Sequence, residues 1–235
     1  MKLSLIVPMY NEISIIENTV KVYNDYLSEH FPDYELIFVD DGSVDGCGAA
    51  VEKLNAPNTR VIRYTPNQGK GNAVKTGMLA ATGDVAMFLD ADIAYGTDVI
   101  AGAAKLLEEH PEASMVIGSR PLHPEGYAGY TAIRKLASKT YIKVLNHAGG
   151  FKLSDSQCGC KAYRGDAAHE IFSRVETKGF AFDFETILWA QKLGYGIVEM
   201  PVKIVNHRES KVSVVRDTFR MLKELRAIKK RVGKA

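Results

Sequence analysis

Residues 85–92 read Val-Ala-Met-Phe-Leu-Asp-Ala-Asp, so an apolar run ends in two carboxylates that bracket one residue. A continuous apolar run is typical of a parallel strand that is buried on both faces. Two carboxylates at the end of such a strand can present oxygen ligands to a hard divalent cation. The stretch therefore predicts a buried strand followed by a metal site at Asp90 and Asp92, with an ordinary surface loop as the alternative.

The surrounding sequence continues this alternation of strand and helix. Short apolar runs alternate with helical patterns as far as residue 118, and the connections between them are short. Such alternation favours an α/β fold with a doubly wound, mostly parallel sheet. The predicted strands are 3–8, 35–40, 60–64, 85–90 and 114–118, and the predicted helices are 13–27, 43–54, 71–81 and 97–109.

The second half of the chain has a less regular pattern. No repeat or low-complexity linker divides it from the first half, so we expect a single domain over residues 1–235. The predicted strands are 156–163 and 196–205, and the predicted helices are 130–146, 166–172, 184–193 and an amphipathic 211–232. The apolar stripe of the first of these helices consists of Ile133, Leu136, Ala137, Tyr141, Val144 and Leu145.

Polar clusters follow three of the predicted strands. They are Tyr10-Asn11-Glu12, Asp40-Asp41-Gly42-Ser43 and Asp90-Ala91-Asp92. Because ligands of doubly wound sheets bind beyond the carboxyl ends of the strands, we expect the three clusters to form one site. A carboxylate of the second cluster can accept hydrogen bonds from a nucleobase or a ribose. Turn formation, with Ser43 or Asp45 capping the next helix, is the alternative.

Residues 67–73 read Asn-Gln-Gly-Lys-Gly-Asn-Ala and precede a predicted helix. Glycines at a helix start can bring backbone N–H groups and a lysine, here Lys70, close to a phosphate. The spacing differs from the GxxxxGK[ST] pattern of a Walker A loop. A plain turn into the helix is the alternative.

The motifs PMYNE, VDDGS, NQGKGNA and DAD, in that order, resemble inverting family 2 glycosyltransferases of the GT-A fold, in particular the polyprenyl-phosphate sugar synthases. The likeness covers about residues 3–215 and continues through the elements GSR, DSQCGCK, FAFDFE and SK. DSQCGCK and FAFDFE are more similar to dolichyl-phosphate β-glucosyltransferase than to the dolichol-phosphate mannose enzymes.

The resemblance implies a role for each matching residue. Asp90 and Asp92 would hold Mg²⁺ or Mn²⁺, and Asp92, Arg120 and Arg134 would be catalytic. Some mannosyl enzymes have a metal-binding Gln at the position that is Ala94 here. The implied donor-binding residues are Pro8, Tyr10, Glu12, Asp40, Asp41, Lys70 and Asp90, the acceptor-phosphate residues are Arg120, Arg134 and Ser138, and the loop that closes over the phosphates has Arg208, Ser210 and Lys211. The implied parts are a nucleotide-sugar-binding half at 1–118, an acceptor-binding half at 119–210 and a basic helix at 211–235.

The implied reaction moves a hexose from a nucleotide diphosphate sugar to a polyprenyl phosphate such as dolichyl or undecaprenyl phosphate. UDP-glucose is the preferred donor and GDP-mannose the alternative. A soluble transferase that acts on a glycan or protein hydroxyl would instead need a carboxylate base, such as Asp155 or Asp183. Asp183 and Glu185 could also position the sugar or pair with basic residues. A nucleotide-sugar-binding subunit without activity is a third alternative, against which the intact DAD, SR and SK elements argue.

The charge distribution and the cysteine content indicate where the protein is located and what it contacts. The first apolar run is cut short at Pro8, so a signal peptide is not expected. Three cysteines give no disulfide framework. Residues 211–235 carry nine Lys/Arg and two Asp/Glu, a net charge of +7, whereas the remaining chain carries −5. We therefore expect a cytoplasmic protein with a peripheral contact to the inner face of the membrane through 130–146 and 211–232.

For each of these two helices, packing on the core or in a dimer interface is the alternative. The expected partners are the nucleotide sugar, the polyprenyl phosphate and the membrane surface. No nucleic acid partner is expected, and a homo-oligomer is left open.

Overall fold

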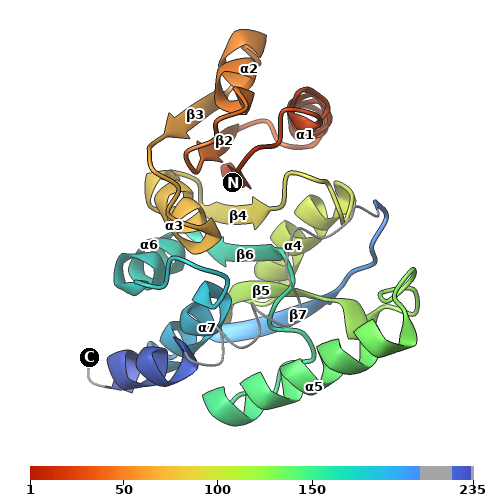
Figure 1. Ribbon diagram of the computed structural model, residues 1–235, viewed down its shortest axis with the longest axis vertical. Coiled ribbons are helices and arrows are strands. Elements are labelled where there is room, and N and C mark those ends of the chain that lie inside the picture. The colour runs from red at the N-terminus through yellow and green to blue at the C-terminus, as the bar shows by residue number, and fades with distance from the viewer. Residues whose placement is uncertain (207–223, 234–235) are drawn as a thin grey trace.

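The computed structural model describes residues 1–206 and 224–233, except for the side chains of Ile133 and Arg134 (Figure 1). Its strands are Leu3–Met9 (β1), Tyr34–Asp40 (β2), Thr59–Arg63 (β3), Val85–Leu89 (β4), Ala113–Ser119 (β5), Cys160–Arg164 (β6) and Gly196–Pro201 (β7). Its helices are Ile16–His30 (α1), Cys47–Leu54 (α2), Lys70–Ala80 (α3), Asp98–Glu109 (α4), Ala132–Gly149 (α5), Gly165–Arg174 (α6), Phe182–Lys192 (α7) and 224–233, with a 3-10 turn at Arg120–Leu122 (η1).

The strands form one sheet in the order β3-β2-β1-β4-β6-β5-β7. β6 runs antiparallel to both of its neighbours, and the other pairs are parallel. The chain moves outward from β1 to β3 and then returns to the other side of β1 with β4. The point where the strand order reverses therefore lies between β1 and β4, which is where doubly wound sheets bind ligands. The predicted mostly parallel α/β sheet is confirmed.

Helices cover both faces of the sheet (Figure 1). Successive residues of a strand point to opposite faces. Met87 accordingly packs in a cluster with residues of α1, α2 and α4, whereas Phe88 packs in a cluster with residues of α3, α6 and α7. This two-sided burial explains why the strands read as continuous apolar runs rather than as alternating ones.

Two local predictions were wrong: the capping of α2 by Ser43 and the start of the strand predicted at 156–163. Ser43 does not cap α2, because its hydroxyl accepts the N–H of Asn11 instead, and the helix begins only at Cys47. Asp45 accepts the N–H of Cys47 but also that of Ile13, so it joins two loops. The strand predicted at 156–163 begins only at Cys160.

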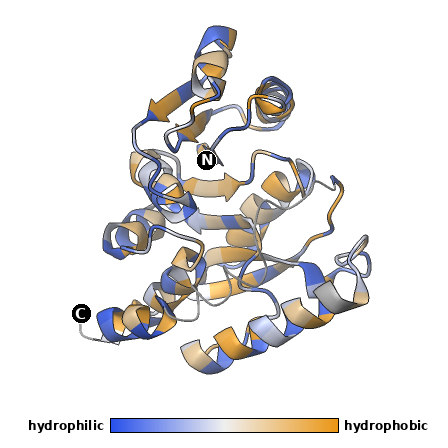
Figure 2. Ribbon diagram, viewed as in Figure 1, coloured by the Kyte–Doolittle hydropathy of each residue, from blue (hydrophilic) through white to orange (hydrophobic). Residues whose placement is uncertain are grey.

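The apolar face of α5 also differs from the predicted stripe. Ile142 and Leu145 are buried, whereas Leu136 is 67% exposed and Val144 is 41% exposed. Figure 1 shows α5 along one end of the molecule, and Figure 2 shows hydrophobic and hydrophilic stretches alternating along it. The exposed apolar side chains lie beside the exposed lysines Lys135 and Lys143.

The part of the predicted 211–232 helix that the structure describes packs on the core. Leu225, Ile228 and Val232 are buried in the cluster that contains Phe182 and Trp189. For residues 224–233, the core-packing alternative is therefore correct, and the rest of the predicted helix lies outside the described residues. Among the described helices, none has both the length and the hydropathy that crossing a bilayer requires.

Candidate active site

The carboxyl ends of β1, β2 and β4 bring the predicted polar clusters to one edge of the sheet. Met9 pairs with Asp40 at the ends of β1 and β2. Beyond this pair, the Asn11 N–H donates to the Ser43 hydroxyl at 3.0 Å, and the Asn11 side chain accepts the N–H of Val44 at 3.0 Å. The loops after β1 and β2 therefore form one connected surface.

Asp41 organises the loop that contains Lys70. Its carboxylate accepts the backbone N–H groups of Gln68 and Gly69, each at 2.8 Å, and the side-chain amide of Asn67 at 2.8 Å. Gly42 is required nearby, because its φ is +75° and a Cβ there would lie 2.7 Å from the Asn67 nitrogen. Asp41 thus fixes the position of residues 67–69, which precede Lys70.

Asp40 has partners of its own. Its carboxylate accepts the Ser43 N–H at 2.8 Å and lies 3.3 Å from the Arg63 Nε. Of the two interpretations that the sequence allows, turn formation describes the contacts of Asp40 and Asp41 in this structure. Their contact with a donor stays a prediction.

Lys70 forms an ion pair with Asp90, the first of the two carboxylates that are predicted to bind a metal. It is the first residue of α3, and its Nζ lies 2.5 Å from Asp90 Oδ1. Burial lowers the pKa of the ammonium, but the charge and hydrogen bond of Asp90 outweigh burial, so the pKa of Lys70 is raised. The edge of the sheet therefore already holds one cation against Asp90.

The pair Asp90 and Asp92 fits a hard divalent cation. Both supply carboxylate oxygens at the end of β4, and an ammonium already stands at one of them. Within 1–206 and 224–233, His, Cys, Asp and Glu side chains form no group of three or more that could hold a metal. A bound diphosphate and water commonly supply further ligands to such a cation.

The absence of a side chain at Gly159 leaves room for the Asp90 carboxylate. A Cβ built on Gly159 would lie 2.1 Å from Asp90 Oδ2, which is far inside van der Waals contact. We expect Gly159→Ala to displace the carboxylate and to lower kcat/KM by roughly 10²-fold, because displacing a reacting group by about 1 Å can cost that much. Steady-state kinetics measures the loss. Gly102→Ala in α4 is the control, since its Cβ would meet only the flexible Met200 sulfur at 3.2 Å. Equal activity of the two variants would contradict the assignment of Asp90.

A buried ion pair lies on the other side of the site. Lys161 on β6 has no solvent exposure, and its Nζ donates to Asp183 Oδ1 and to the Cys158 carbonyl, each at 2.6 Å. Burial raises the pKa of Asp183, and Lys161 offsets this only in part. Asp183 is therefore bound to an internal cation.

Arg120 and Asp155 form a second such pair. The guanidinium donates to both carboxylate oxygens, at 2.6 Å from Nε and 3.0 Å from Nη2, and its Nη1 lies 3.0 Å from the Tyr130 hydroxyl. Burial lowers the pKa of Arg120, but Asp155 outweighs it and the pKa is raised. A guanidinium has five N–H donors, so Arg120 can hold Asp155 and Tyr130 and still donate to another anion.

The structure describes only some of the residues that the sequence predicts for the acceptor side. Ser138 and the backbone of Arg134 belong to α5. The side chain of Arg134 and all of Arg208, Ser210 and Lys211 lie outside the described part of the chain.

Sequence reasoning missed Glu199 on β7. Its Oε1 accepts the N–H groups of Ser154 at 2.8 Å and Asp155 at 3.1 Å. These bonds tie residues 154–155, which precede β6 in the chain, to β7. Alternation within a short edge strand gave no signal for this contact.

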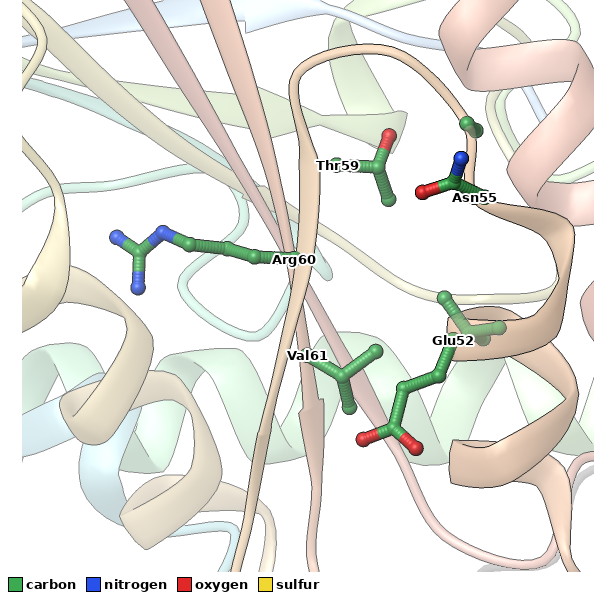
Figure 3. Close-up of a pocket in the computed structure, with 7 residues that line it drawn as sticks. Glu52, Asn55, Thr59, Arg60 and Val61 are labelled. Carbon is green, nitrogen blue, oxygen red and sulfur yellow. The ribbon is translucent and has the colours of Figure 1, made fainter.

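A shallow cavity of about 180 Å³ lies elsewhere, between α2 and β3 (Figure 3). Glu52 and Asn55 of α2 line it together with Thr59 and Val61. Thr59 begins β3, so the cavity faces the amino ends of the strands and lies at the opposite edge from Asp90. It does not belong to the site described above.

The chain has the GT-A fold, with the carboxylate pair after β4 and the lysine loop at the same edge of the sheet. Glucosyl-3-phosphoglycerate synthase from Mycobacterium tuberculosis, solved with Mn²⁺, UDP and glucosyl-3-phosphoglycerate, matches with a TM-score of 0.71 and 20% identity over 99% of this chain and 80% of that chain. Mannosyl-3-phosphoglycerate synthase from Rubrobacter xylanophilus matches with a TM-score of 0.71 and 20% identity over 100% of this chain and 76% of that one.

The chain belongs to glycosyl transferase family 2, whose model matches residues 4–172. Glycosyltransferase AglD of Haloferax volcanii is 30% identical over 94% of this chain, which spans only 36% of that protein. Dolichyl-phosphate beta-glucosyltransferase of Dictyostelium discoideum is 29% identical over 95% of this chain and 72% of its own length. Undecaprenyl-phosphate mannosyltransferase of Micrococcus luteus is 30% identical over 91% of this chain and 88% of its own length.

Proposed function

We propose that this family 2 enzyme transfers a hexose, preferentially glucose, from a nucleotide diphosphate sugar to a polyprenyl phosphate with inversion at the anomeric carbon. The names of two similar proteins, a dolichyl-phosphate glucosyltransferase and an undecaprenyl-phosphate mannosyltransferase, support this acceptor class. UDP-glucose is the preferred donor, and GDP-mannose is the alternative.

The observation that carries the proposal is that Asp155 and Asp183 are each paired with a cationic side chain. An acceptor hydroxyl needs a base that removes its proton, whereas a phosphate is already anionic near neutral pH. Asp155 is held by Arg120 through both of its oxygens, and Asp183 is held by the buried Lys161. Because both candidate bases are already neutralised by cations, a phosphate acceptor is favoured over a glycan or protein hydroxyl.

On the donor side, Pro8, Tyr10, Glu12, Asp40 and Asp41 would bind the nucleotide, with the base and ribose held at the ends of β1 and β2. Asp90 and Asp92 would hold Mg²⁺ or Mn²⁺, which when bound neutralises charge on the departing diphosphate. Lys70 would leave Asp90 and pair with the diphosphate. Residues 1–118 then form the nucleotide-sugar-binding half.

Lys70→Met tests this exchange of partners. We expect the nucleotide-free variant to bind Mn²⁺ several-fold more tightly, because Asp90 loses a competing cation, and to bind UDP more weakly, because the diphosphate loses one. Calorimetric titrations measure both affinities. Lys21→Met, which breaks an exposed Lys–Asp pair on α1, is the control. An Mn²⁺ affinity that rises in neither variant would show that Lys70 does not compete for Asp90.

On the acceptor side, Arg120 would bind the lipid phosphate through the guanidinium N–H groups that do not donate to Asp155 and Tyr130. Arg134 and Ser138 of α5 would assist, and the loop residues Arg208, Ser210 and Lys211 would close over the phosphates. Residues 119–210 thus form the acceptor-binding half and 211–235 the basic end. The exposed Leu136, Val144 and lysines of α5 suit a peripheral contact with an anionic membrane.

A donor-and-acceptor matrix tests the proposal. The purified protein is given Mn²⁺, either UDP-glucose or GDP-mannose, and polyprenyl phosphate or none, and the released nucleoside diphosphate and the glycolipid are measured. We expect lipid-dependent release of UDP that EDTA abolishes. Binding of a nucleotide sugar without lipid-dependent transfer would favour a hydroxyl acceptor instead.

A further inference from the structure

Helix 224–233 is joined to α7 by an ion pair between Arg231 and the buried Glu185. Arg231 donates from Nε to Glu185 Oε1 at 2.8 Å and from Nη2 to Glu185 Oε2 at 2.9 Å. Glu185 belongs to α7 and has no solvent exposure, whereas Arg231 is partly exposed. The two residues are far apart in the sequence, and a bidentate pair of this kind fixes both partners in one geometry.

The same pair holds residues 176–179, the segment that connects α6 to α7. Glu185 Oε2 accepts the N–H of Thr177 at 2.9 Å and that of Glu176 at 3.3 Å. Arg231 Nη2 also lies 3.0 Å from the Thr177 hydroxyl. If the arginine were lost, the buried Glu185 would lack its counter-charge, which destabilises this arrangement and with it the position of the segment that Glu185 holds.

Residues 176–179 in turn pack directly on the lysine loop. The Lys178 carbonyl accepts the N–H of Asn72 at 3.2 Å, and the Lys178 ammonium donates to the Gln68 side chain at 2.7 Å. A Cβ on Gly69 would lie 2.6 Å from the Lys178 carbonyl oxygen, and one on Gly71 would lie 2.5 Å from that of Thr177. Backbone thus touches backbone here, so a shift of 176–179 moves the loop.

We propose that Glu185 and Arg231 are positioning residues for the donor diphosphate. They act through 176–179 on the loop 67–71, whose Lys70 contacts Asp90. Asp41 holds the loop from one side, and 176–179 holds it from the other. This inference rests on the proposed donor site, but its structural link can be measured without a donor.

The experiment compares Arg231→Ala, Arg231→Lys and Glu185→Gln with Arg164→Ala. Arg164 is the matched control, since its guanidinium donates to the carbonyls of Leu107, His110 and Ala113. Those partners lie near the amino end of β5, away from Lys70. All four variants should therefore lose stability, but only those of the Glu185–Arg231 pair should alter the loop.

Two readouts are used. Hydrogen exchange at the amides of residues 68–72 requires no ligand and should speed up in Arg231→Ala and Glu185→Gln but not in Arg164→Ala. The Kd for UDP and the KM for the donor should rise about tenfold or more in the same two variants. The KM for the acceptor should stay unchanged, and Arg231→Lys should recover part of the loss.

Unchanged exchange at 68–72 and an unchanged UDP Kd in Arg231→Ala would overturn the inference, as would equal effects in Arg164→Ala. If the wild-type protein bound no nucleoside diphosphate, the proposed function would fail, and the exchange rates alone would decide whether the pair controls the loop. If Arg231→Ala did not fold, Arg231→Lys and Glu185→Gln would provide the same comparison.

Discussion

Asp92→Asn and Asp90→Asn are each expected to lower kcat/KM by about 10³-fold, which corresponds to about 4 kcal/mol of transition-state stabilisation. Each substitution removes a negative charge where the cation that neutralises the departing diphosphate would bind. Neither carboxylate lies in the hydrophobic core, so the fold should persist. Release of nucleoside diphosphate, measured as Mn²⁺ is increased, gives both the rate and the metal requirement.

Asp98→Asn is the control for these variants, because Asp98 is an exposed carboxylate in the first turn of α4, a few residues after the metal pair. It should retain full activity. The two site variants also differ from each other, since Asp90→Asn releases Lys70 and Asp92→Asn does not. Activity of Asp92→Asn within a few-fold of the wild type would exclude a metal role for this residue.

Substitution of Arg120 is expected to have the second large effect. Arg120→Ala leaves Asp155 buried without its cation, which should cost about 3–5 kcal/mol of stability. Arg120→Lys keeps the charge but loses both the two-pronged contacts with Asp155 and the further guanidinium N–H groups that could donate to the acceptor. For Arg120→Lys we expect the KM for polyprenyl phosphate to rise roughly 10-fold or more, with little change in the KM for the donor.

Thermal unfolding and steady-state kinetics separate these two effects of Arg120. Arg60→Lys is the control, since Arg60 lies on the edge strand β3 and pairs with Glu35, away from the site. It should leave both KM values unchanged. A rise in the donor KM of Arg120→Lys with an unchanged acceptor KM would place Arg120 on the donor side and contradict the proposal.

The parallel half of the fold could be predicted because its strands are buried on both faces and therefore appear as apolar runs. The loops that follow β1, β2 and β4 meet because parallel strands end at the same edge. The bounds of the antiparallel strand β6 differ more from the prediction. The strand predicted from residue 156 begins only at Cys160, and residues 154–155 just before it donate their N–H groups to Glu199, which is distant in the sequence.

Contacts between distant side chains account for most of what the sequence could not reveal. The sequence allows Asp155 as a base, but its partner Arg120 is close to it only in the folded structure. Arg231 belongs to a basic stretch that suggested a membrane surface, yet it pairs with the buried Glu185. Charge patterning identifies neither pairing. The first depends on how η1 packs against the segment before β6, and the second on how helix 224–233 packs against α7.

The central claim, that the acceptor is a phosphate rather than a hydroxyl, is tested most directly with two lipids. Polyprenyl phosphate and polyprenol of the same chain length are presented in the same detergent, with Mn²⁺ and the donor that the matrix identifies, and the glycolipid formed is quantified. Glycolipid formed from the phosphate alone is the predicted result. Transfer to the polyprenol at a comparable rate would contradict the account, because it would require a base that the Arg120–Asp155 and Lys161–Asp183 pairs do not supply.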